Sequence, residues 1–203
     1  MSVVIVDYGM GNIGSVTRAL EECGVDVDTT CDSEELLGAS HIVLPGVGAF
    51  PDGMAHLKEK NTDEALREAV KKGVPVLGIC LGMQLLSDES DEINKTSGLG
   101  LIPGNVVKMN SNGGALRVPH VGWNEAHFLT DNPLFIDIPN ASDFYFVHSF
   151  HYVVSDQKNI AAETPYGINF SSIIAKDNVF GVQFHPEKSS LYGLKMIKNF
   201  VSL

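Results

Sequence analysis

Hydrophobic and polar residues alternate between two patterns in the first half of the chain. Short runs of β-branched and aliphatic residues, typical of strands buried on both faces, are separated by segments whose apolar residues recur every three or four positions, as in a helix with one buried face. The predicted strands are Val3–Val6, 25–29, His41–Leu44 and 74–79, and the predicted helices are 13–23, a short one opening at 32–35, and 63–72. This alternation indicates an α/β fold with an open, mostly parallel sheet flanked by helices. Its chemistry is expected at the carboxyl ends of the strands.

The second half of the chain is richer in strands. Its predicted strands are 106–109, 144–150, 152–154, 173–176 and 179–183, followed by a closing helix at 189–201. Neither an internal repeat nor a low-complexity linker interrupts the sequence. Because 203 residues suffice for one α/β domain with a sizeable core, a single domain over residues 1–203 is expected.

Cys80 lies in the segment GICLG at 78–82, directly after an apolar run. A strand that ends in Gly-x-nucleophile-x-Gly is the signature of a sharp strand-to-helix turn, whose strained backbone needs glycines. Most lone cysteines are small buried hydrophobes, but a cysteine that is merely packed needs neither glycine. At a helix N-terminus the helix dipole favours thiolate, and backbone N–H groups face a developing oxyanion. Cys80 is therefore predicted to be a catalytic nucleophile.

His185 and Glu187 supply what the thiol still needs. Residues i and i+2 of an extended segment point to the same side, so the Glu187 carboxylate is placed to hold the His185 imidazole in the tautomer that accepts a proton from sulfur. A His-Pro-Glu segment alone is weak evidence, because a histidine in a loop is more often structural. The prediction rests on the three residues jointly, and since His185 comes 185 − 80 = 105 positions after Cys80, they must meet through tertiary structure.

Two further features fit a thiol site. Gln84 follows Cys80 by one helical turn on the same face, where its amide is placed to anchor a substrate; a glutamine on the helix surface is the alternative. The loop PGVG at 45–48 follows the strand before the nucleophile strand. It is either a plain turn or, together with the Leu81 N–H, an oxyanion hole that its two glycines make switchable.

Composition and the remaining motifs exclude several functions. A net charge of −11 argues against nucleic acid or an anionic membrane as partner. A GxGxxG match at 9–14 lacks a distinguished ribose-binding acid, so no nucleotide cofactor is expected. His148 and His151 have no further ligands at metal spacing, so no metal is expected. Trp123 is either a core aromatic in a turn or an interface anchor.

The cysteines and the apolar runs bear on the compartment. The three cysteines form no CxxC pair, which suits a reducing environment and one active thiol. No apolar run has the length of a membrane span, and the first residues resemble a strand and lack the basic region of a signal peptide. A cytoplasmic location is expected.

Together these residues resemble the class I, or triad, glutamine amidotransferases, which have a flavodoxin-like fold with a nucleophile elbow. The segments GICLGMQ at 78–84 and FHPE at 184–187 carry the resemblance. Other segments are similar to the glutaminase subunits of imidazole glycerol phosphate synthase, from histidine biosynthesis. They are DYGMGN at 7–12, PGVGAF at 45–50, GLGLIPG at 98–104, PHVGWN at 119–124, FVHS at 146–149 and HPEKS at 185–189.

The resemblance implies a mechanism without a cofactor. The Cys80 thiolate attacks the side-chain amide carbon of glutamine, His185 protonates the leaving ammonia and then activates water, and Glu187 orients His185. The Leu81 N–H and a flipped Gly46-Val47 peptide hold the oxyanion. The residues that the resemblance assigns to glutamine binding are Gly48, Gln84, Glu92, His148 and Ser149, with Glu92 facing the substrate ammonium.

The resemblance also implies a heterodimer with a (βα)8-barrel cyclase subunit. That subunit uses the ammonia, delivered through a closed channel, to make imidazole glycerol phosphate and an aminoimidazole carboxamide nucleotide. The residues that match the interface are Asn12, Pro119, Trp123, Tyr145 and Lys188. The alternatives are a glutaminase subunit for pyridoxal phosphate, anthranilate or aminodeoxychorismate synthesis, a γ-glutamyl peptidase with the same triad, and a catalytically dead interaction module.

Overall fold

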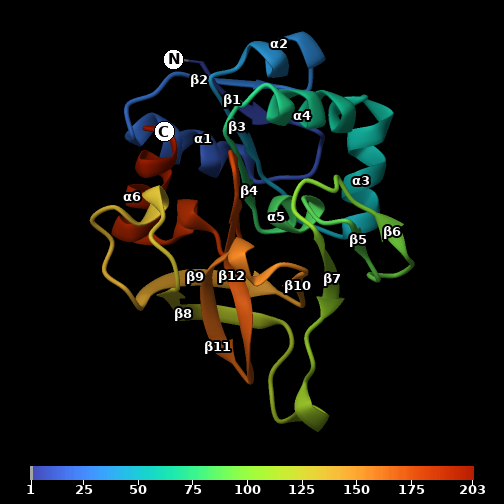
Figure 1. The fold of residues 1–203 in the computed structure, drawn as a ribbon, viewed down its shortest axis with the longest axis vertical. Helices are drawn as coiled ribbons and strands as arrows, with labels where there is room; N and C mark the ends of the chain where they lie inside the picture. The colour runs from blue at the N-terminus through green and yellow to red at the C-terminus, as the bar shows by residue number, and fades with distance from the viewer. Residues whose placement is uncertain (1) are drawn as a thin grey trace.

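The computed structural model describes residues 2–203, which fold around a 13-stranded sheet (Figure 1). The strand order is β2-β1-β3-β4-β13-β12-β10-β7-β5-β6, and β11, β8 and β9 branch from β12. The strands are β1 (Val3–Val6), β2 (Val27–Thr30), β3 (His41–Leu44), β4 (Val76–Ile79), β5 (Glu89–Ser90), β6 (Thr96–Ser97), β7 (Gly104–Lys108), β8 (His120–Phe128), β9 (Ser142–His148), β10 (Phe150–Val154), β11 (Ile160–Tyr166), β12 (Ile168–Lys176) and β13 (Val179–Val182). The α-helices are α1 (Ile13–Glu22), α2 (Ser33–Gly38), α3 (Phe50–Glu59), α4 (Thr62–Lys71), α5 (Leu81–Leu85) and α6 (Ser190–Phe200).

The parallel half of the sheet carries the site. Strands β2, β1, β3, β4 and β13 are parallel neighbours, and all but β2 are buried along their whole length. Because successive strand residues face opposite sides, Val3 and Ile5 join a core cluster with α1 and α6, whereas Val4 and Val6 join one with α2 to α5 (Figure 1). Helices on both faces explain why these strands are continuous apolar runs.

The other strands are mostly antiparallel, and β7 to β12 lie at one end of the molecule, in the lower part of Figure 1. There β8 and β9 pair from His120↔His148 to Ala126↔Ser142. Strand β12 connects this part to the parallel half, because it pairs with β13, β11 and β10.

The parallel sheet and most of the predicted elements are confirmed. Helices α1, α4 and α6 agree with the predictions to within one residue at each end. Asp32 begins α2 as expected, since its Oδ1 accepts a hydrogen bond from the Glu34 N–H at 2.8 Å. Strand β2, however, begins at Val27, two residues later than predicted.

Five elements have no predicted counterpart: α3, β5, β6, β8 and β11. Helix α3 has a proline in its first turn and Gly53 farther in, which obscure its helical pattern although proline is favoured at that first turn. Strand β8 contains Gly122 at φ 138°, which weakens its strand pattern. The single predicted strand at 144–150 is wrong, because β9 ends at His148 and β10 begins at Phe150.

Candidate active site

Cys80 occupies a strained turn between β4 and α5, with φ 55° and ψ −109°. A Cβ on Gly82 would lie 1.8 Å from the Leu44 carbonyl oxygen, and one on Gly78 would lie 2.7 Å from the Gly82 carbonyl oxygen. Both flanking glycines are therefore required by close backbone approach. This confirms the predicted elbow, which holds the thiol at the carboxyl end of β4.

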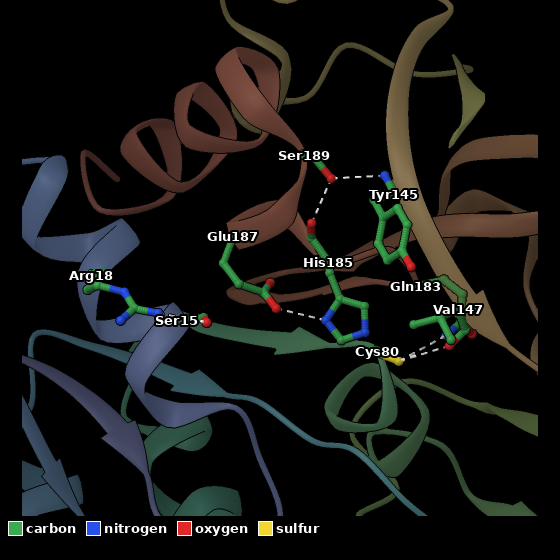
Figure 2. Close-up of polar contacts among 9 residues, drawn as sticks. All are labelled: Ser15, Arg18, Cys80, Tyr145, Val147, Gln183, His185, Glu187 and Ser189. Carbon is green, nitrogen blue, oxygen red and sulfur yellow. Dashed lines mark hydrogen bonds and ion pairs between the residues drawn. The ribbon is translucent and has the colours of Figure 1, made fainter. Parts of the chain in front are cut away.

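Strand β13 brings the second half of the site beside this thiol. Ile79 and Val182 are register partners, and the Cys80 N–H donates to the Val182 carbonyl at 2.8 Å. The Cys80 Sγ lies 3.9 Å from the Val147 carbonyl oxygen and 3.9 Å from the Gln183 Nε2 (Figure 2).

His185 and Glu187 form the predicted pair, but the expectation of an extended segment is wrong, because Pro186–Lys188 is a 3-10 helix. The His185 Nδ1 and the Glu187 Oε1 are 2.8 Å apart, and their side chains are 3% and 0% exposed. The other ring nitrogen, Nε2, has no hydrogen-bond partner and points toward the Cys80 sulfur in Figure 2. Thiol, imidazole and carboxylate thus lie in the order that a nucleophile, a base and its orienting acid require.

The electrostatics favour a charged imidazole. Burial lowers the pKa of His185, but the hydrogen bond to Glu187 and the negative charge of Cys80 and Glu187 outweigh it and raise that pKa to about 9. No direct bond joins Nε2 to the sulfur in this geometry, so the rise reflects how close the two groups lie. The His185 imidazole is therefore protonated at neutral pH.

Ser189 fixes the backbone of the base. Its Oγ donates to the His185 carbonyl at 2.6 Å and accepts from the Tyr145 N–H at 3.0 Å, while the His185 N–H donates to the Tyr145 carbonyl at 2.9 Å (Figure 2). Sequence reasoning gave no role to Ser189 or to Gln183. Both residues lie within the segment VQFHPEKS at 182–189, and their polar side chains beside the His-Pro-Glu residues are the signal by which the sequence could have indicated them.

A cavity of about 360 Å³ opens beside the thiol. It gathers most of the predicted substrate residues. Its lining comprises Val47, Gly48, Cys80, Leu81, Gln84, Glu92, Pro119, Val147, His148, Ser149, Phe150 and His185. Gly46 and Glu187 do not line it: Gly46 packs against Tyr8 and the start of α5, and Glu187 binds the Nδ1 side of the imidazole. Pro119, predicted for the interface, lines the cavity.

Gln84 and Glu92 are both held in place by other groups. The Gln84 Nε2 donates to the Phe150 carbonyl and to the Gln183 Oε1, each at 3.0 Å. Gln84 is 5% exposed, so the alternative of a surface glutamine is wrong. The Glu92 Oε2 accepts a hydrogen bond from the Phe50 N–H, the first residue of α3, at 2.8 Å.

The 45–48 loop is packed tightly. The Tyr8 hydroxyl donates to the Pro45 carbonyl at 2.9 Å, and burial, then the charge of Cys80, raises the pKa of Tyr8. A Cβ on Gly46 would lie 2.5 Å from the Tyr8 hydroxyl oxygen and 2.9 Å from the Gly82 nitrogen. Gly48 has φ 107°, a conformation that glycine adopts easily.

His148 belongs to a hydrogen-bonded chain. Its Nδ1 lies 2.9 Å from the Phe150 carbonyl, which only accepts, so Nδ1 carries the proton and Nε2 accepts from the His120 Nδ1 at 2.9 Å. Burial lowers the pKa of His148 to about 3 and that of His120 to about 4. Among residues 2–203, no group of three or more His, Cys, Asp or Glu side chains is arranged to hold a metal ion.

The outer face next to the cavity is apolar. Val121 and Trp123 on β8 pair with Val147 and Tyr145 on β9, and the rings of Trp123 and Tyr145 meet edge to face at 6.1 Å. Trp123 is 52% exposed within a strand, so the expectation of a core aromatic in a turn is wrong. We call these four residues the β8–β9 patch.

Comparisons with known proteins agree with this geometry. A model of the family "Glutamine amidotransferase class-I" matches residues 4–203. The chain is 47% identical to imidazole glycerol phosphate synthase subunit HisH of Moorella thermoacetica, covering 99% of this chain and 94% of that one. It is 46% identical to subunit HisH 1 of Methanococcus maripaludis, covering 99% of each.

Solved structures share the fold. A glutamine amidotransferase crystal structure superposes with a TM-score of 0.76 at 18% identity, covering 98% of this chain and 97% of that one. The structure of PurLQS from Thermotoga maritima has a TM-score of 0.76 at 21% identity, covering 99% and 97%. In residues 2–203, no helix has the length and apolar character needed to cross a membrane.

Proposed function

The chain belongs to the class I glutamine amidotransferases and, within them, to the HisH subunits of imidazole glycerol phosphate synthase, the glutaminase subunits of histidine biosynthesis, and we propose that it hydrolyses glutamine with Cys80, His185 and Glu187. The observation that carries this assignment is the buried His185–Glu187 pair, whose free ring nitrogen faces a thiol held on a strained elbow.

The mechanism follows from the protonation of His185. With the proton on the imidazole, the Cys80 thiolate attacks the side-chain amide carbon of glutamine. The oxyanion is held by the Leu81 N–H, which has no acceptor within α5 because it begins that helix, and by an N–H of the flipped Gly46-Val47 peptide. His185 then gives its proton to the leaving ammonia as the C–N bond breaks, which leaves a glutamyl thioester. His185 next takes a proton from water, whose attack releases glutamate.

The cavity lining accounts for recognition of glutamine. Both hydrogens of the Gln84 amide are used within the protein, so Gln84 presents its carbonyl oxygen to the substrate. Glu92, held at the cavity wall by the Phe50 N–H, is the counterion that we assign to the substrate ammonium. We assign the backbone contacts with the substrate to Gly48, His148 and Ser149, which all line the cavity.

We propose that a (βα)8-barrel cyclase subunit docks on the β8–β9 patch and receives the ammonia. Exposed aromatic residues are typical anchors of interfaces, and the Val147 carbonyl connects the patch directly to the thiol. Exposed Asn12 and Lys188 extend the same interface from α1 and the end of the His-Pro-Glu segment. A closed interface is needed because ammonia in water at neutral pH becomes ammonium.

The assay measures glutamate release from glutamine by the chain alone, with the cyclase subunit, and with that subunit and its nucleotide ligand. We expect little activity from the chain alone and a large rise in the full mixture, because the Gly46-Val47 peptide then completes the oxyanion hole. Full activity of the lone chain would remove the need for a switchable loop. No rise with folded, reduced protein would refute the assigned partner.

We further infer that residues 1–203 act as one domain in the cytoplasm. One connected sheet spans both halves of the described chain. All three cysteines are free, which suits a reducing compartment.

A further inference from the structure

We propose that the Gln183 side chain donates a hydrogen bond to the Cys80 thiolate and so keeps the nucleophile ready for attack. The proposal rests on the role of Cys80 proposed above. It adds to the triad the residue that directly follows β13, to which the resemblance to known families gives no role.

The register of two parallel strands places this amide. Ile79 on β4 pairs with Val182 on β13, so the next residue of each strand, Cys80 and Gln183, emerges at the same edge of the sheet. Gln183 is fully buried, and its Nε2 lies 3.9 Å from the Cys80 Sγ (Figure 2). A buried amide is costly unless its hydrogen bonds are made, so the neighbouring donors and acceptors determine which way the Gln183 amide is oriented.

A backbone carbonyl fixes that orientation. The Phe150 carbonyl only accepts, so the end of the Gln84 amide that faces it must be the NH2 group. The same NH2 group lies 3.0 Å from Gln183, so the facing atom of Gln183 must be its oxygen. The NH2 group of Gln183 is thereby directed at the sulfur.

The two polar neighbours of the sulfur favour opposite protonation states. The Val147 carbonyl, 3.9 Å from Sγ, accepts from a thiol but repels a thiolate. The Gln183 NH2 group donates a stronger hydrogen bond to a thiolate than to a thiol. Once His185 holds the proton, the Gln183 amide is the neighbour that stabilises the remaining negative charge on sulfur.

The test is the rate at which iodoacetamide alkylates Cys80 at about neutral pH, followed by peptide mass spectrometry with Cys31 of the same chain as the internal reference. Alkylation requires the thiolate but no glutamine or partner. Loss of a hydrogen bond to a charged group should slow Cys80 alkylation in Gln183→Leu by roughly ten- to a hundredfold. Glutamate release in the complex should lose a similar factor in kcat with little change in KM.

Ser172→Ala is the matched control. Ser172 is buried on β12, its Oγ has no hydrogen-bond partner, and only its backbone carbonyl contacts the Gln183 N–H. This variant should alkylate within about twofold of the parent. A folded Gln183→Leu protein that alkylates at the parental rate overturns the proposal.

Gln183→Glu covers the case in which Gln183→Leu fails to fold, because it keeps the shape and still accepts from Gln84. A carboxyl buried beside a thiolate holds its proton well above its ordinary pKa of about 4.3. While protonated, this carboxyl donates a hydrogen bond to the sulfur. When ionised, it repels the thiolate. Alkylation should thus be near parental at mildly acidic pH and fall behind as the pH rises; a parental pH profile overturns the proposal. If the Gln183 variants alkylate as expected but the parent complex releases no glutamate, the proposed function is refuted and the role of Gln183 stands.

Discussion

Replacing Glu187 by Gln separates the charge of the triad acid from its hydrogen bond. The Glu187 Oε2 is buried without a partner, whereas Oε1 accepts from the His185 Nδ1 at 2.8 Å. A glutamine therefore keeps the bond by directing its oxygen to Nδ1 and its NH2 to the vacant side. The imidazole tautomer is retained while the negative charge is lost.

The expected effect appears on the alkaline side of the pH profile. His185 has a pKa of about 9, so its imidazolium form, the acid that protonates ammonia, is lost as the pH rises through that value. Cys80 and Glu187 both contribute to the rise above the ordinary value of about 6.5. Removing one of the two charges should lower the alkaline midpoint of kcat/KM by roughly one to two pH units. At neutral pH the rate should fall by about ten- to a hundredfold.

The assay is glutamate release by the complex with the cyclase subunit, measured from mildly acidic to strongly alkaline pH for the parent, Glu187→Gln and Glu187→Leu. Glu187→Leu removes the hydrogen bond and the charge together, so its loss of activity should be larger, on the order of 10⁴-fold. An unchanged alkaline midpoint in Glu187→Gln, or a leucine variant no worse than the glutamine variant, would refute this account of the pair.

Three shorter predictions test other parts of the site. Cys80→Ala should abolish glutamate release yet unfold at a temperature close to the parent's by calorimetry, because the glycines build the turn. Gly46→Ala should lower kcat by about 10²- to 10³-fold, since its Cβ meets the Tyr8 hydroxyl at 2.5 Å and displaces the oxyanion loop. Trp123→Ala should weaken cyclase binding at least about tenfold by calorimetric titration, whereas Ile136→Ala, equally exposed but outside the β8–β9 patch, should not.

Local patterns predicted the parallel half of the fold well. Strands buried on both faces are continuous apolar runs, so Val3–Val6 and His41–Leu44 were found with their observed bounds. The antiparallel half is half-exposed and contains Gly122, and its strands depend on pairing with distant partners. That is why β8 and β11 were missed, and why 144–150 was not divided at Ser149.

The candidate site divides in the same way. Cys80 could be predicted because its two glycines are neighbours in sequence, and both prove sterically necessary. Ser189 and Gln183 act through atoms 44 and 103 positions away, on Tyr145 and Cys80. No spacing along the chain reports such contacts. The exposure of Trp123 likewise depended on which face of β8 lies against the core.

The adjacency of β4 and β13 explains how distant parts of the chain make one site. Parallel strands lie about 4.8 Å apart, so the pairing Ile79↔Val182 places the nucleophile turn beside the segment that supplies Gln183 and His185. The positive φ of Cys80 costs on the order of 1–3 kcal/mol, and it persists because the fully buried strand β4 precedes the turn and the fully buried helix α5 follows it. A thiol on a mobile loop would not keep its alignment with the His185 ring. The strained turn is therefore maintained by the same core packing that brings the acid, the base and the amide to the sulfur.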